Sequence, residues 1–124
     1  MYKYLNMNPK GNDIEDCAIR AISVAEGISW DRAYDKLSVS ARNKGLMINS
    51  VEAIEEYLDS RYERVPFYTD TVGEFIKTHS HGTFLITMQG HITVLKDGIN
   101  YDTFDCKDRI MWNAWYVPYN RRKY

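Results

Sequence analysis

The sequence predicts an α+β domain in which N-terminal helices pack on a C-terminal antiparallel sheet. In the first half of the chain, apolar residues recur at helical spacing behind residues that can cap a helix. In the second half, the pattern changes to alternating runs rich in β-branched and aromatic residues. Helices followed by a meander of strands are typical of the α+β class. We therefore expect one domain over residues 1–124, with helices over about 12–79 and a sheet over about 82–118.

Four helices are predicted in the first half, and each is opened by a side chain that can accept a hydrogen bond from the first turn. These capping residues are Asn12, Ser29, Ser50 and Thr71. Glu15 and Glu74 lie three residues after the first and the last of them, which is the spacing of a capping box. Gly27 and Gly45 are expected to end the first two helices.

The predicted strands are bounded by turn residues. They are Thr83–Gln89, His91–Lys96, Ile99–Phe104 and Ile110–Val117. A further edge strand is expected over Tyr62–Phe67, where Pro66 is tolerated. The three tryptophans, Trp30, Trp112 and Trp115, are expected in the core rather than on a ligand-binding surface.

Asp97-Gly98 predicts a two-residue turn between two of these strands. If the two residues form the whole loop, Val94 faces Tyr101. Alternate residues then share one face of the hairpin, namely His91, Thr93, Leu95, Asn100, Asp102 and Phe104. Asp102 becomes the diagonal neighbour of His91, with Cβ atoms roughly 7–8 Å apart, which is within side-chain reach. A loop of odd length would instead place the two side chains on opposite faces.

The composition argues against several classes of function. Sixteen basic and seventeen acidic side chains give a net charge of −1, without the basic excess typical of nucleic-acid binders. No apolar run approaches the length of a membrane-spanning helix, and the first residues lack the apolar core of a secretory signal. We therefore expect a cytosolic protein whose partners are neither nucleic acid nor membrane. The basic run at 121–123 is expected to be a solvated tail.

Cys17, His91 and Asp102 are the candidate catalytic residues. Cys17 lies within about one turn of the predicted helix start, where free N–H groups and the helix dipole favour a thiolate. Its neighbour Asp16 acts in the opposite direction, because a negative charge raises the pKa of a thiol. A carboxylate beside His91 fixes the tautomer and leaves one ring nitrogen free to act as a base. Phe104, on the same face, can shield this pair from water.

Structural explanations compete with the catalytic one. Cys17 can be a small buried apolar residue, and His91 can be an ordinary core or surface residue. The two cysteines are too few for a disulfide framework and are expected as separate thiols, so Cys106 is the other candidate nucleophile, without a helix terminus or a matched base. His79 and His81 lack the cysteine or carboxylate cluster that would complete a metal site, and no metal is expected.

The order of these residues resembles that of papain-like cysteine peptidases. A cysteine begins an early helix, a histidine lies on a later strand, and an acid or amide lies on the strand that follows. Asp102-Thr103-Phe104 resembles the family's motif of an acid or amide, a small residue and an aromatic. Residues 12–17 are similar to the segment before the cysteine in the small C39-like branch, and residues 90–102 are similar to that branch's histidine hairpin. The resemblance spans residues 8–105.

The resemblance implies a minimal papain-like fold and a thiol hydrolase that cleaves a peptide, isopeptide or related acyl bond without a cofactor. Cys17 then corresponds to the nucleophile, His91 to the base and Asp102 to the orienting residue. The family's usual oxyanion-hole glutamine is replaced by Gly11, and Asn12 beside it can supply an amide N–H, although it is equally the helix cap. Two alternatives remain: transfer of the acyl group to an amine by the same triad, and an inactive scaffold that binds a partner protein.

Overall fold

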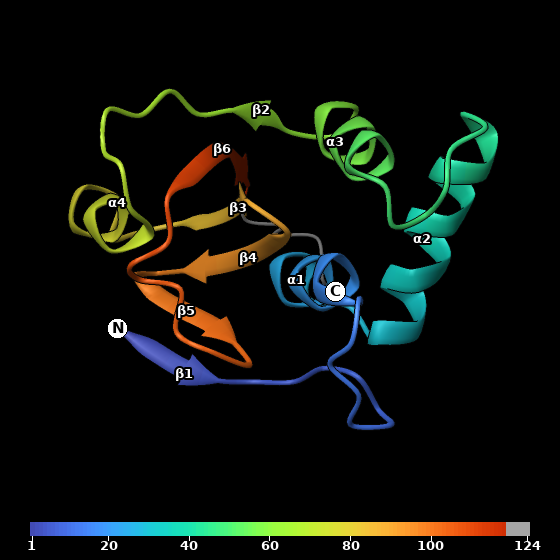
Figure 1. Cartoon of the computed structure of the whole chain (residues 1–124), viewed down its shortest axis with the longest axis horizontal. Helices are drawn as coiled ribbons and strands as arrows, with labels where there is room; N and C mark the ends of the chain where they lie inside the picture. The colour runs from blue at the N-terminus through green and yellow to red at the C-terminus, as the bar shows by residue number, and fades with distance from the viewer. Residues whose placement is uncertain (119–124) are drawn as a thin grey trace.

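The computed structural model describes residues 1–118, and the basic run at 121–123 lies outside them. In chain order the elements are β1 (Tyr2–Tyr4), α1 (Cys17–Glu26), α2 (Trp30–Asn43), α3 (Val51–Asp59), β2 (Glu63–Arg64), α4 (Val72–Thr78), β3 (Thr83–Met88), β4 (His91–Lys96), β5 (Ile99–Asp102) and β6 (Met111–Val117) (Figure 1). The helices lie mostly before the strands, so the protein has the predicted α+β fold. None of the helices within residues 1–118 is both long enough and apolar enough to cross a membrane.

The strands form one sheet in the order β1-β5-β4-β3-β6-β2. Every neighbouring pair is antiparallel except β1 and β5, which are parallel. The expected edge strand is present, but only as the two residues of β2. Strand β1 was not predicted, because its three residues are too few to show an alternating pattern. The sheet therefore draws on segments outside residues 82–118, one at each edge.

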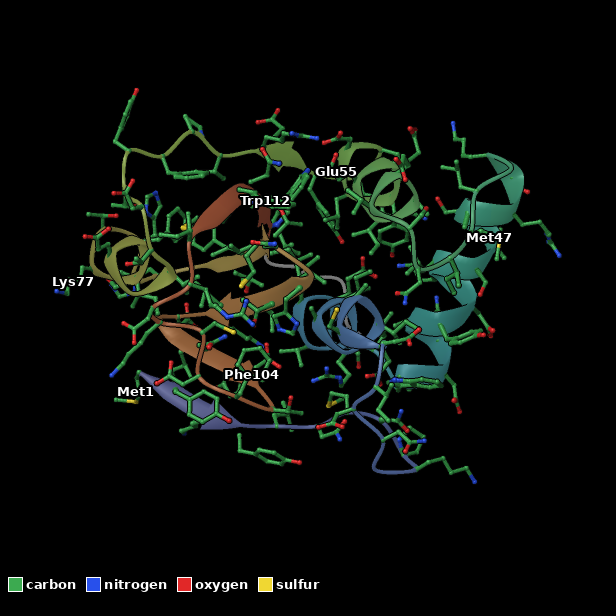
Figure 2. All side chains as sticks on the ribbon, in the orientation of Figure 1. Met1, Met47, Glu55, Lys77, Phe104 and Trp112 are labelled. Atoms are coloured by element: carbon green, nitrogen blue, oxygen red, sulfur yellow. The ribbon has the colours of Figure 1, made fainter. Side chains whose placement is uncertain are left out.

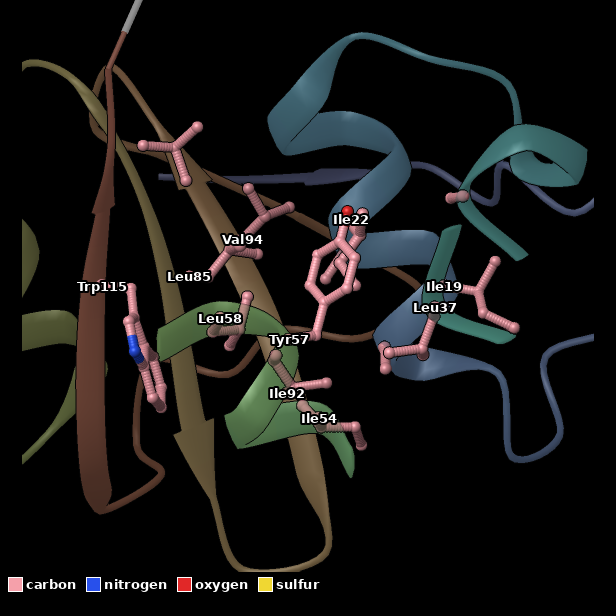
Figure 3. Packing of buried hydrophobic residues seen from close by; sticks show 14 residues of the cluster. Ile19, Ile22, Leu37, Ile54, Tyr57, Leu58, Leu85, Ile92, Val94 and Trp115 are labelled. Atoms are coloured by element: carbon pink, nitrogen blue, oxygen red, sulfur yellow. The ribbon is translucent and has the colours of Figure 1, made fainter. Parts of the chain in front are cut away.

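Two apolar clusters fill the two faces of the sheet. Helix α1 and helix α3 pack on one face around Tyr57 and Trp115, which are fully buried, and α2 packs against these two helices (Figure 3). Helix α4 packs on the other face, where Phe75 contacts Phe84 edge to face with ring centroids 5.3 Å apart. Figure 1 shows α4 on the opposite side of the strands from α1, α2 and α3. The sheet is thus buried on both sides, which fixes the register of its central strands.

The β4–β5 hairpin has the register that the two-residue turn predicts. Val94 pairs with Tyr101 and Lys96 pairs with Ile99. The turn residues both have left-handed backbones, with φ of 51° at Asp97 and 80° at Gly98. This is the conformation of the mirror-image turns that match the twist of a hairpin. The even loop places the side chains of the candidate pair on the same face.

Three of the four predicted helix starts are correct, and the first is wrong. Ser29 and Ser50 accept hydrogen bonds from their helices, and Thr71 forms the expected capping box. Helix α1, however, begins only at Cys17, with Asp16 as its N-cap. Asn12 lies in the preceding loop, where its carbonyl accepts a 3.0 Å hydrogen bond from the amide of Asn6. This contact, together with the left-handed backbone of residue 15 (φ 61°), prevents the helix from starting at the apparent capping box.

The expectation that all three tryptophans lie in the core is wrong for one of them. Trp115 is fully buried, and Trp30 is partly buried with its indole N–H donating to Asp16. Trp112 is instead 51% exposed. Trp112 is the second residue of β6, near the start of the strand, where its side chain stays half exposed.

Candidate active site

His91 and Asp102 form a short hydrogen bond across the β4–β5 hairpin. The distance from His91 Nε2 to Asp102 Oδ2 is 2.7 Å, and both side chains are more than nine-tenths buried. An ionised carboxylate can only accept, so the proton of this bond lies on Nε2. The remaining ring nitrogen, Nδ1, is then the one that can exchange a proton with another group. Figure 2 shows this region between the hairpin and α1, with Phe104 labelled beside it.

Further donors hold the carboxylate of Asp102 in place. Thr93 Oγ1 donates to Oδ2 over 2.6 Å, and the backbone N–H of Thr103 donates to Oδ1 over 2.7 Å. Arg20 Nη1 lies 3.2 Å from Oδ1. Burial opposes ionisation, but hydrogen bonds from His91 and Thr93 and the charge of His91 lower the pKa of Asp102 from 3.8 to about 2. The carboxylate is therefore ionised at neutral pH and rigidly oriented.

Arg20 links this carboxylate to the start of α1. Its Nε lies 2.8 Å from Oδ1 of Asp16, one helical turn before it, and its Nη1 reaches Asp102. The sequence had suggested that Asp16 would oppose a thiolate at Cys17. In the structure its charge is paired with Arg20, and Arg20 itself contributes to lowering the thiol pKa. The guanidinium thus couples the cysteine-bearing helix to the histidine-bearing hairpin.

Cys17 is the first residue of α1 and is partly exposed. Burial raises the pKa of its thiol, but the neighbouring His91 side chain and the backbone N–H of Ile92, with the charges of His91 and Arg20, lower that pKa below its ordinary value. In turn, burial lowers the pKa of His91, whereas its contacts with Asp102, Cys106 and Cys17 raise it from 6.5 to about 11. Both directions favour a thiolate beside an imidazolium.

The Cys17–His91 contact is looser than the His91–Asp102 bond. Both side chains line one pocket, and each shifts the pKa of the other. Among residues 1–118, however, no hydrogen bond of standard length and angle joins the sulfur to the ring. Catalytic hydrogen bonds are often long or poorly aligned until substrate binds. The structure therefore brings Cys17, His91 and Asp102 together, and the His91–Asp102 contact is tighter than the Cys17–His91 contact.

Cys106 lies closer to the pair than the sequence suggested. Its Sγ is 3.5 Å from Asp102 Oδ2 and 3.7 Å from the carbonyl of Phe104, and the side chain is fully buried. Ligand-type atoms of His91, Asp102 and Cys106 lie within 4.8 Å of one another, and such an N, O and S set suits zinc. The hydrogen bonds to Asp102 already explain this proximity without a metal. The backbone N–H of Cys106 donates a 3.1 Å hydrogen bond to Asn100 Oδ1, which holds the loop after β5 against the hairpin. The expectation that Cys106 has no matched base is therefore wrong, because this loop places its thiol near His91.

Phe104 contacts the ring of His91, and the shielding of the His91–Asp102 bond from water stays a prediction. Its ring centroid is 4.7 Å from that of His91, in a tilted arrangement. Asn12, the proposed oxyanion donor, is exposed in the loop before α1 and lines a different cavity from the one shared by Cys17 and His91. Its role stays a prediction that requires this loop to turn the amide toward the thiol. The backbone N–H of Cys17 lies at the helix start, where first-turn donors have no partner within the helix.

A pocket of about 220 Å³ opens beside the thiol. Its walls come from the loop before α1, from α3, from the β3–β4 turn and from β6. The lining residues are Glu15, Cys17, Asn49, Val51, Ile54, Glu55, Thr87, Met88, Gly90, His91, Ile92 and Trp112. The side chains of Cys17 and His91 and a mainly apolar cavity therefore meet at one place. Pockets with this combination are typical of active sites.

Sequence reasoning missed several residues of the site. Arg20 was recognised as a partner for a buried carboxylate, but its two partners could not be named. Thr93 was placed on the correct face without a role, and Glu55 and Trp112 were not connected with the site at all. The shared face of the hairpin was a signal for Thr93, whereas no local pattern links α3 or β6 to the thiol. Comparisons of the chain with protein-family models, characterised proteins and solved structures found no match, so its function has to be argued from this geometry.

Proposed function

We propose that this protein is a papain-like thiol hydrolase acting on a peptide, isopeptide or related acyl bond. The observation that carries the proposal is the His91–Asp102 hydrogen bond of 2.7 Å beside a helix-start cysteine with a lowered pKa. A buried carboxylate, an imidazole with one free nitrogen and a partly exposed thiol are the groups that nucleophilic catalysis requires. The match of these positions with the sequence motif of the papain-like family supports the same conclusion.

The reaction follows from the ionisation of these groups. The Cys17 thiolate attacks the carbonyl carbon, a C–S bond forms, and negative charge develops on the carbonyl oxygen. The backbone N–H of Cys17 is positioned at the helix start to stabilise that charge. The His91 imidazolium gives its proton to the leaving amine as the C–N bond breaks. Neutral His91 then takes a proton from water, whose oxygen attacks the thioester and releases the acid and Cys17.

The partner that this chemistry implies is a peptide or protein chain, and the reaction needs neither a metal nor an organic cofactor. Both cysteines are free thiols, and a reducing compartment such as the cytosol would keep the nucleophile active. Neither a nucleic acid nor a membrane is part of the proposal. Transfer to an amine uses the same acyl-enzyme, so the acceptor alone separates a hydrolase from an acyltransferase.

Thiol labelling followed by turnover tests the proposal. Iodoacetamide at pH 6 should modify Cys17 selectively over Cys106, as mass spectrometry of the digested protein would show. A peptide library incubated with the protein should yield cleaved products, and added amine should reveal any transfer. Cys17→Ala should lose turnover and retain the fold, whereas Cys106→Ser, which keeps a donor beside Asp102, serves as the comparison.

Equal and slow labelling of both cysteines would contradict an activated thiolate and would favour a binding module. Full turnover by Cys17→Ala would mean that the chemistry lies elsewhere in the chain.

A further inference from the structure

We propose that the pocket beside Cys17 selects a lysine side chain of the substrate, next to the bond that is cleaved. The inference rests on the proposed hydrolase function and adds the substrate class. It follows from three properties of the pocket: the shape and polarity of its walls, the sign of its charges, and an unsatisfied hydroxyl group. Figure 2 labels Glu55 on α3 and Trp112 on β6, and both residues line the pocket.

The walls suit a long aliphatic stem. Val51 and Ile54 contribute from α3, Met88 and Ile92 from the two strands beside the β3–β4 turn, and Trp112 from β6. A volume of about 220 Å³ accepts one extended side chain rather than a folded peptide segment. Since Cys17 and His91 line the same cavity, a side chain bound here belongs to a residue at the scissile bond. The exposed indole ring of Trp112 additionally offers a face to a cation.

The charges of the pocket favour a cation at the end of that stem. Glu15 and Glu55 are both in the lining, and none of its residues is a lysine or an arginine. The two carboxylates give the lining negative charge, which Arg64 offsets in part at Glu55. Among residues 1–118, Glu15 forms no salt bridge. A lysine would supply the missing positive charge.

Within residues 1–118, Glu55 forms a salt bridge with Arg64 alone, and the shorter contacts of Arg64 are made to Asp59. Arg64 Nη2 lies 3.6 Å from Glu55 Oε1, beyond ordinary hydrogen-bond length. The same guanidinium makes two 2.9 Å hydrogen bonds to the carboxylate of Asp59. Arg64 is not part of the pocket lining. Glu55 therefore retains acceptor capacity toward the cavity.

Thr87 is a further polar residue of the pocket lining. Its side chain lines the cavity, the residue is 8% exposed, and its Oγ1 has no hydrogen-bond partner among the described residues. A buried hydroxyl without a partner is costly and calls for an explanation. The oxygen itself has almost no accessible surface, so Thr87 must change its side-chain rotamer before it can accept from the ammonium or the backbone N–H of a bound lysine residue. Purely apolar occupants would leave this hydroxyl unsatisfied.

Reactive single-residue probes can test the selection without a known substrate. The chloromethyl ketones of N-acetyl-lysine, N-acetyl-norleucine and N-acetyl-glutamate alkylate a thiolate and differ in the side chain that enters the pocket. Norleucine matches the lysine stem without the charge. We expect lysine to inactivate Cys17 about fivefold faster than norleucine, as for a partly exposed ion pair, and glutamate to be slowest. The lysine preference should shrink as salt is raised.

Variants on one helix supply matched controls. Glu55→Gln should bring the lysine-to-norleucine ratio close to one, and Glu55→Lys should reverse the order of lysine and glutamate. Glu52→Gln removes the same charge from an exposed position of α3 outside the pocket and should keep the preference. Iodoacetamide, which carries no side chain, reports the reactivity of Cys17 in every variant.

The outcomes separate the two proposals. Selective labelling of Cys17 by iodoacetamide with equal rates for lysine and norleucine would overturn the lysine pocket and leave the hydrolase proposal standing. Faster reaction of norleucine would overturn it as well, because the pocket would then be apolar in function. Absence of selective Cys17 labelling would refute the hydrolase function itself. The ratio of lysine to norleucine inactivation rates in the wild-type protein tests the lysine pocket even if a variant fails to fold.

Discussion

Asp102→Asn is the substitution that most directly tests the proposed geometry. It keeps the shape of the side chain and removes its charge and one of its acceptor oxygens. In the native protein both oxygens face donors: Oδ2 accepts from His91 and Thr93, and Oδ1 accepts from Thr103 and lies near Arg20. An asparagine side chain has one carbonyl oxygen and one amide NH₂. The NH₂ group must therefore face either His91 and Thr93 or Thr103 and Arg20, which are themselves donors in the native protein. Either the histidine changes its tautomer or the guanidinium loses a partner.

The expected loss of stability can be worked from the ionisation of Asp102. Its pKa falls from 3.8 in a free side chain to about 2 in the folded protein. A tenfold change in an ionisation constant corresponds to about 1.4 kcal/mol, so the charged form contributes about 2 kcal/mol at neutral pH. A depressed pKa gives stability that is present above pH 4 and declines as the pH falls toward about 2. The variant should therefore be about 2 kcal/mol less stable at pH 7 and close to wild type near pH 2.

The expected loss of activity is larger than the loss of stability. If the amide of the substituted side chain donates to Nε2, the proton of His91 moves to Nδ1, and the ring can no longer accept a proton from Cys17. Turnover should fall by about 10³-fold or more, and Cys17 should require a higher pH for alkylation. Urea unfolding and the pH profile of iodoacetamide labelling measure the two effects. Asp105→Asn, an exposed change three residues away, is the control.

An unchanged pH profile of Cys17 labelling in folded Asp102→Asn would refute this reasoning. It would mean that the histidine does not depend on the carboxylate for its tautomer or its charge.

Three further outcomes are expected. Glu26→Gln should cost about 2 kcal/mol in urea unfolding at pH 7, because this nearly buried carboxylate accepts from Lys36, Tyr57 and Tyr62. Burial raises and these hydrogen bonds lower its pKa, to a net value below 4.5, so the difference from wild type should shrink as the pH falls below 4.5. The pKa of His91 is raised from 6.5 to about 11, so protonated His91 stabilises the fold fully below pH 6.5, and this stabilisation is lost as the pH rises toward 11. Urea unfolding should show this decline in stability for the wild type but not for His91→Gln. Dialysis against EDTA should leave turnover unchanged, and a loss restored by zinc would show that the His91 cluster holds a metal.

The hairpin could be predicted from sequence because its geometry is set locally. Asp97-Gly98 selects a two-residue turn, and strand alternation then fixes which side chains share a face. The His91–Asp102 contact follows from those two facts. The caps at Ser29, Ser50 and Thr71 were predictable for the same reason, since each bond lies within four residues of the cap.

The rest of the site depends on contacts between distant segments, which local patterns do not encode. The first helix starts late because the Asn6 side chain holds the carbonyl of Asn12, and that contact cannot be read from the apparent capping box. The partners of Arg20 lie 4 and 82 residues away, and only the second of these is set by the packing of α1 on the sheet. The pocket wall formed by α3 and β6 likewise arises from tertiary packing.

The presence of two thiols near one histidine raises the question of which acts as the nucleophile. Cys106 is fully buried, its backbone N–H is bound to Asn100, and its Sγ points at the carboxylate of Asp102 and at a backbone carbonyl. In that position a thiol can donate a hydrogen bond, while a thiolate would face two acceptors. Cys17 has the opposite surroundings: a helix start, the N–H of Ile92, Arg20 and an open pocket. Under the proposed function, His91 therefore acts on Cys17, while the Cys106 thiol donates to Asp102.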